Sequence, residues 1–123
     1  MDAQQQQAKG LLARALHLAD LYNWADAAQS FAEAEHLFID AGDHRNALYA
    51  KLGLIRSNIE RDQRTLPAVA AQLAEALEDD VLLQNDKELR MFCLIVKGDI
   101  DTETNTGSMM QDWAQVQTLA QQL

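Results

Sequence analysis

The chain has 123 residues, the size of a single domain that can bury a hydrophobic core without a metal or a disulfide. Apolar residues make up 48% of it, whereas glycine occurs five times and proline once, which favours long helices over an all-β fold. Nineteen acidic residues against ten basic ones give a formal net charge of −9, which argues against binding to nucleic acids or anionic membrane surfaces. We therefore expect an all-α protein that binds neither.

The sequence also indicates in which cellular compartment the protein is located. No apolar run approaches the roughly 20 residues that a membrane-spanning helix needs, and the polar start MDAQQQQAKG does not resemble a signal peptide. The single Cys93 cannot form an internal disulfide, and the apolar residues around it predict a buried thiol in a reducing compartment. We expect a cytoplasmic protein.

The first third of the chain predicts a helical hairpin. A helix that begins within residues 4–8 and runs to about Tyr22 has an apolar arc wide enough for two neighbours. Asn23 is a plausible N-cap for a second helix that continues to about Asp40. Two amphipathic helices thus follow one another across an almost absent turn.

The second helix of this hairpin carries Ala27, Phe31 and Ala34 on one face, at spacings of four and three. Small residues therefore flank one large aromatic ring. This pattern predicts that another helix approaches the face closely.

A third and a fourth helix follow. Residues 41–43 should end the second helix and cap a third one from His44 to about Glu60. Gly53 costs about 1 kcal/mol relative to Ala inside a helix, so we expect a close helix approach there; the alternative is a site that tolerates glycine without a packing role. Thr65 can cap a fourth helix to about Leu77, with Pro67 in its first turn.

The last third predicts two more helices. Residues 81–84 read as an apolar-anchored connection. Asn85 and Glu88 resemble a capping box for a fifth helix that ends at about Lys97, and residues 98–106 read as a polar loop.

Ser108 with Gln111 resembles the start of a sixth helix through residue 123. Its inner stripe would consist of Trp113, Val116, Ala120 and Leu123. The chain ends on this helix without a polar closing element, so we expect a fragment of a longer array or an end that a partner covers.

These helix pairs resemble the tetratricopeptide-repeat family. In the first pair, large, small and large residues occupy the motif positions of the first helix, and small, large and small residues those of the second: Leu11, Ala15, Leu18, then Ala27, Phe31, Ala34. In the second pair, Tyr49, Leu52 and Gly53 reproduce the large, Leu and Gly positions. The match is good over about residues 8–60.

The sequence departs from this family at several places. Arg14 replaces an expected Leu, and the longer linker displaces Ala70, Ala74 and Leu77 from the 34-residue register. In the third pair only three residues match the motif: Gly98, Trp113 and Ala120. The resemblance is loose after residue 60.

The resemblance implies one helical-repeat domain, residues 1–123, with helix pairs at about 4–40, 43–77 and 86–123 stacked as a short right-handed superhelix. It also implies a non-enzymatic scaffold or adaptor that binds a protein or peptide in a concave groove. The residues that would look into this groove are Lys9, Leu12, Leu16, Ala19, Asp20, Ala47, Ala50, Leu54, Ser57 and Asn58.

The implied groove is mostly apolar or small. Family members that clamp the acidic C-terminus of a chaperone need Lys, Asn and Arg at such positions, which Leu12, Leu16, Ala50 and Leu54 do not supply. We expect an apolar or amphipathic segment instead, from a partner, a second copy, or further repeats of the same chain.

Catalytic and metal-binding patterns are weak. His17, His36 and His44 lack metal-ligand spacing. The segment 99–110 departs from a calcium-binding EF-hand loop because Thr104 stands where Gly is required and Met110 where Glu is required. We expect no enzyme activity, cofactor or metal. An all-α regulatory or enzyme domain with a small-molecule pocket beside the apolar fifth helix remains the alternative.

Overall fold

The computed structural model describes residues 3–123, and every regular element within them is a helix, which confirms the all-α prediction. No helix among these residues is both long and apolar enough to cross a membrane. The chain divides into two compact units, Met1–Asn58 and Ile59–Leu123, which are described separately below. The expectation of one repeat domain stays a prediction.

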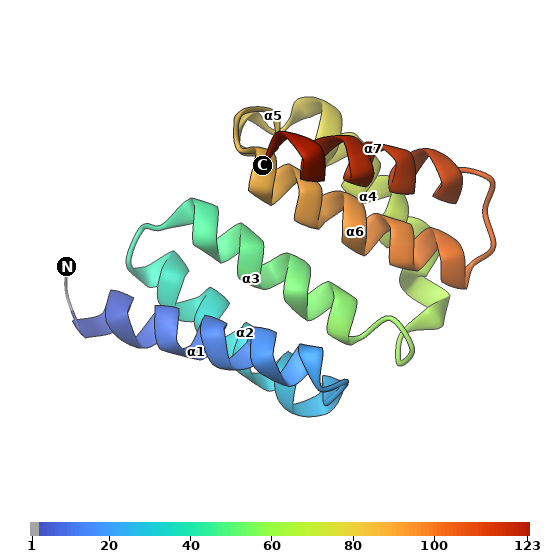
Figure 1. Ribbon diagram of the computed structural model, residues 1–123. Helices are drawn as coiled ribbons and strands as arrows, with labels where there is room; N and C mark the ends of the chain where they lie inside the picture. Colours follow the sequence, from blue (N-terminus) through green and yellow to red (C-terminus); the bar gives the residue numbers. More distant parts are fainter. Residues whose placement is uncertain (1–2) are drawn as a thin grey trace. The chain divides into compact units, whose positions relative to one another are not determined.

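The first unit consists of three helices: α1 (Ala3–Asp20), α2 (Trp24–Asp40) and α3 (His44–Ser57). Each helix runs antiparallel to the one before it (Figure 1). Helix α2 packs against both α1 and α3, and α1 also contacts α3. The predicted hairpin is confirmed to within two residues, whereas α3 ends three residues before the expected Glu60.

The turns of this unit follow local chemistry. Gly42 adopts a left-handed φ of 76°, and the Asp43 carboxylate accepts a hydrogen bond from the backbone N of Asn46 at 3.1 Å, so residues 41–43 end one helix and cap the next as predicted. Asn23 holds the N-cap position of α2 but makes no side-chain cap bond. Its amide donates instead to the Asp26 carboxylate at 2.9 Å.

Close packing around Phe31 holds the unit together. Ala27 and Ala34 are fully buried and Phe31 is 1% exposed. A Cβ added at Gly53 would lie 2.3 Å from Cε1 of Phe31, so the phenyl ring of α2 rests directly on the backbone of α3. The predicted close approach at Gly53 is confirmed.

The second unit contains a short 3₁₀ helix, η1 (Gln63–Thr65), and four α-helices: α4 (Leu66–Asp79), α5 (Val81–Asn85), α6 (Lys87–Glu103) and α7 (Met109–Gln122). Within the unit α6 is central, since α4, α5 and α7 all pack against it (Figure 1). Its nearly all-round apolar sequence is what such a position requires.

Two predicted helix boundaries in this unit are wrong, and one predicted cap lacks its side-chain hydrogen bond. The expected connection 81–84 is the helix α5, because Asp80 caps it by accepting from the backbone N of Leu82 at 2.9 Å. Asp86, not Asn85, caps α6 by accepting from the backbone N of Leu89 at 3.0 Å. Thr65 holds the N-cap position of α4 as predicted but makes no side-chain cap bond, since its hydroxyl donates to the carbonyl of Asp62.

The prediction of a loop at residues 98–106 is also wrong, because α6 continues to Glu103. Ser108 precedes α7 without a side-chain cap bond. The inward side of α7 carries the buried Asp112 and the half-buried Val116 and Leu119, whereas Ala120 and Leu123 of the expected stripe are exposed. The predicted stripe left Asp112 on the outer side of the helix, whereas the structure buries this carboxylate.

Candidate functional site

The first candidate site is the face of α1 and α3 that the repeat resemblance implies. Its ten residues differ in exposure. Lys9 and Asp20 are exposed, and a second group is half-buried: Leu12, Leu16, Leu54 and Asn58. The remaining four are buried: Ala19, Ala47, Ala50 and Ser57. Partner binding by these residues stays a prediction.

The half-buried leucines of this face meet on one core. Leu12 and Leu16 of α1 and Leu54 of α3 all pack against the buried cluster that contains Ala15, Ala19, Ala27 and Phe31. Leu12 also packs against a second cluster, which contains Ala47 and Ala50. We call Leu12, Leu16 and Leu54 the leucine face. Each of the three leucines keeps part of its side chain accessible.

The buried members of the predicted set have internal roles. Ala19, Ala47 and Ala50 fill the space between the helices, and the hydroxyl of Ser57 donates to the carbonyl of Gly53 at 2.8 Å. In this conformation they support the leucine face from beneath and present no side chain to a partner.

An aromatic group at the end of the first hairpin escaped the sequence reasoning. The guanidinium carbon of Arg56 lies 5.4 Å from the centre of the Trp24 ring, and the ring of Tyr22 meets Trp24 edge-on at 6.3 Å. Tyr22 adopts a left-handed φ of 59°, which a bulky residue seldom does, and its side chain is 80% exposed. The arrangement ties α3 to the α1–α2 turn.

The second unit contains a buried ion cluster that the sequence reasoning also missed. Lys97 Nζ lies 2.7 Å from Oδ2 of Asp101 and 3.0 Å from Oδ1 of Asp112. The hydroxyl of Ser108 donates to Asp101 at 3.0 Å. The cluster joins α6 to α7, and its three charged side chains are at most 11% exposed.

The cluster carries two carboxylates against one ammonium. Burial raises the pKa of Asp112 to about 6, and the neighbouring Asp101 carboxylate adds to the rise. Burial also acts to raise the pKa of Asp101, but hydrogen bonds within the cluster outweigh it and lower that pKa. Burial acts to lower the pKa of Lys97, but its bonds to both carboxylates raise it. These groups join α7 to α6 and are largely shielded from solvent.

The signal for this cluster was the i, i+4 spacing of Lys97 and Asp101. It was lost because the helix was expected to end at Lys97.

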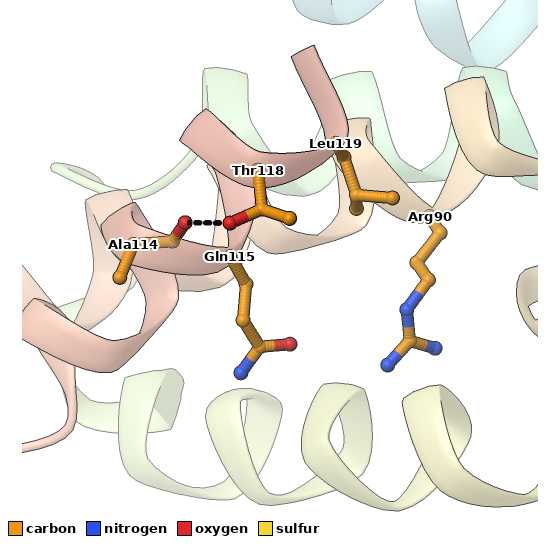
Figure 2. A pocket seen from close by; sticks show the side chains of 5 residues that line it. All are labelled: Arg90, Ala114, Gln115, Thr118 and Leu119. Atoms are coloured by element: carbon orange, nitrogen blue, oxygen red, sulfur yellow. Dashed lines mark hydrogen bonds between the residues drawn. The ribbon is translucent and has the colours of Figure 1, made fainter. Parts of the chain in front are cut away.

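A pocket of about 300 Å³ lies between α6 and α7. Its lining consists of Arg90 from α6 and four residues of α7, Ala114, Gln115, Thr118 and Leu119. Figure 2 shows the side chains of Arg90 and Gln115 extending to the same side of the two helices. The Thr118 hydroxyl donates to the carbonyl of Ala114 at 3.1 Å, whereas the side chains of Arg90 and Gln115 point away from that bond (Figure 2).

The structure also places the thiol and the acidic segment that were considered for nucleophilic and metal chemistry. Cys93 is fully buried, as predicted, and burial raises the pKa of its thiol to about 12, which disfavours the reactive thiolate. The residues that the structure describes contain no group of three or more His, Cys, Asp or Glu that could hold a metal ion. Five residues of the acidic segment considered for calcium, 99–103, belong to α6.

Comparison of the chain with protein-family models, curated proteins and solved structures finds no match. The repeat resemblance therefore rests on the motif residues of the helix pairs.

Proposed function

We propose that this chain is a non-enzymatic protein–protein interaction module of the tetratricopeptide-repeat type, which binds an apolar or amphipathic helix or peptide on the leucine face. The observation that carries the proposal is the convergence of Leu12, Leu16 and Leu54 from two helices onto one core cluster, each still partly accessible. A partner that covers the remaining apolar surface gains roughly 25 cal/mol for each Å² buried.

The packing of the first unit supports a repeat-like architecture. In that family the second helix of a pair contacts its own first helix and the first helix of the next pair, and α2 has both contacts. Phe31 of α2 resting on Gly53 of α3 supplies the close approach that stacked repeats need. A short right-handed superhelix is part of this proposal.

The charge of the chain narrows the partner. An apolar segment with basic flanks suits a protein of net charge −9, because opposite charges speed encounter and disfavour acidic competitors. Such a segment belongs to a partner protein, to a second copy, or to further repeats of the same chain. A cytoplasmic scaffold or adaptor is the role that fits these properties.

Leu16→Glu is the sharpest test of the leucine face. Leu16 packs against one core cluster, whereas Leu12 packs against two, so Leu16→Glu should perturb the fold less than Leu12→Glu. A carboxylate placed under a bound apolar segment is costly, and we expect capture of amphipathic peptides from a displayed library to weaken at least tenfold.

The matched control is Gln7→Glu, which adds the same side chain on the same helix at an exposed position away from the leucine face. Circular dichroism should show both variants helical and folded. If Leu16→Glu retains peptide capture while folded, the binding surface lies elsewhere.

A further inference from the structure

Arg90 has an unusual electrostatic position in the second unit. Its side chain is half-buried, and Nη1 donates to the carbonyl of Leu77 at the end of α4, at 2.9 Å. Among the residues that the structure describes it forms no ion pair. A guanidinium has five N–H donors, so most of its hydrogen-bonding capacity remains for another group.

Two acidic residues that precede Arg90 in the chain cap helices. Asp80 caps α5 through the backbone N of Leu82, and Asp86 caps α6 through the backbone N of Leu89. Among the residues that the structure describes, this partly desolvated cation therefore has no carboxylate partner. Charge complementarity at Arg90 favours an anion.

The surroundings of Arg90 define the rest of the ligand. Ala114 and Leu119 of α7 supply apolar surface in the pocket, and the Gln115 carboxamide extends to the same side as the guanidinium (Figure 2). A volume of about 300 Å³ is at the lower end of the range for small-molecule sites, which suits a ligand of about ten non-hydrogen atoms.

We propose that the pocket between α6 and α7 binds a small organic carboxylate, whose oxygens accept hydrogen bonds from Arg90 and Gln115 and whose apolar part contacts Ala114 and Leu119. A planar guanidinium can hold both carboxylate oxygens at once, which distinguishes an acid from its uncharged amide. The site lies wholly within the second unit and does not depend on the leucine face.

The test uses the full chain, with hexanoate and phenylacetate as probes and hexanamide as the uncharged analogue. Two-dimensional amide NMR should show saturable shifts for α6 and α7, with a Kd of about 1 mM or tighter for the acids. Hexanamide should bind at least tenfold more weakly, because it offers no charge to Arg90.

Two pairs of variants locate the site. Arg90→Gln should weaken acid binding at least tenfold, whereas Lys87→Gln, the same charge change at an exposed position on α6, should leave it unchanged. Ala114→Phe should fill the pocket and abolish binding, whereas Ala120→Phe adds the same ring at an exposed position of α7 and should not. The Ala114 pair keeps the test valid if Arg90→Gln alters the end of α4.

Three results would overturn the proposal. The first is the absence of saturable shifts with either acid. The second is equal binding of hexanamide, which would make the pocket apolar without anion recognition. The third is binding of a blocked peptide with adjacent Leu and Asp where the free acids fail, which would assign the pocket to a protein ligand.

Discussion

At the scale of single residues, a contact between two helices depends on the absence of one carbon atom. Any Cβ at position 53 would overlap the Phe31 ring, and that ring is itself 1% exposed in a core of alanines. Closely packed interiors adjust little, so ring or backbone has to move to accept a methyl group. Gly53 is therefore a packing requirement of the α2–α3 contact.

We predict that Gly53→Ala lowers the free energy of unfolding by about 1–3 kcal/mol, because the strain of overpacking exceeds the better helix propensity of alanine. Urea denaturation followed by fluorescence in a Trp113→Phe background, which leaves Trp24 as the sole tryptophan, would measure this. Trp24 reports on the first unit, because it packs against the same cluster as Phe31.

The control is Gly10→Ala in α1, where nothing lies within 4 Å of the added Cβ. The same substitution there should stabilise the protein by about 0.5–1 kcal/mol. Equal effects of the two changes would contradict the packing role of Gly53.

Individual residues were predictable where their neighbours in sequence decide the outcome. Cys93 lies within an apolar run, and it is buried; Pro67 starts a helix, and it lies in the first turn of α4. Capping was less predictable, because Asn85 and Asp86 are adjacent acceptors and only the observed backbone geometry distinguishes them. Asp86 takes the bond, and the boundary moves by one residue.

At the scale of elements, α6 shows why the local pattern was insufficient. The stretch Gly98 to Glu103 contains a glycine, threonine and three acidic residues, which are typical of a loop. Contacts with α7 reverse that preference: the Trp113 ring lies against Gly98, and Asp101 shares Lys97 with Asp112. Tertiary contacts outweighed weak local propensity.

The two candidate sites also differ in how far the sequence alone predicts them. The residues of the leucine face could be named from the sequence because the repeat resemblance assigns them to one face of the helices now seen as α1 and α3. The pocket at Arg90 requires α6 and α7 to be paired in a particular register, and periodicity alone does not supply that register. The placement of Asp112 on the inner side of α7 could not be read from an apolar stripe.

The contact between α7 and α6 combines a buried polar cluster with apolar residues of α7 that are only half-buried or exposed. Asp112 is the buried residue of α7, whereas its larger apolar residues are half-buried or exposed. The groups that face Asp112 are Lys97 and Asp101 of α6, and Ser108 bonds to Asp101. A polar cluster is thus part of the contact between α6 and α7, and its protonation should influence stability.

We predict that the second unit becomes more stable as pH falls from 8 to 5. The folded pKa of Asp112, about 6, lies above the usual 3.8, so the folded state binds a proton more tightly than the unfolded chain. This stabilisation is complete below pH 3.8 and is lost as pH rises through 6. One pH unit below that pKa, the gain from this group is about 1 kcal/mol.

Trp24→Phe leaves Trp113 as the sole tryptophan, so urea denaturation followed by fluorescence reports on the second unit. In this background Asp112→Asn should flatten the pH dependence between 8 and 5. Asp79→Asn removes the same charge at an exposed position of α4 and should preserve it. A pH profile that is the same in all three proteins would show that the Asp112 proton does not contribute.

At the scale of the whole molecule, the excess of acidic residues governs how partners approach. A net charge of −9 produces a long-range attraction for cations, which salt screens over about 8 Å at physiological ionic strength. The leucine face itself contains little charge, since Lys9 and Asp20 balance one another at its edges. Affinity should come from apolar contact, and the rate of encounter from the charge of the surrounding surface.

We therefore predict that one amphipathic helical peptide, made with Lys flanks, Gln flanks or Glu flanks around an unchanged apolar face, binds at different rates. The association rate of the Lys-flanked peptide should exceed that of the Glu-flanked one about tenfold or more at low salt. Raising the salt from 20 to 500 mM should bring the three rates together, because the Debye length falls from roughly 20 Å to roughly 4 Å.

Stopped-flow fluorescence of labelled peptides would separate the two contributions. Dissociation rates should change little with the flanks or the salt, because the apolar face of the peptide is constant. Leu16→Glu should act in the opposite way and accelerate dissociation, since it alters the buried contact and adds only one charge to the surface. If the Glu-flanked peptide associates as fast as the Lys-flanked one at low salt, the acidic surface does not steer partners to this face.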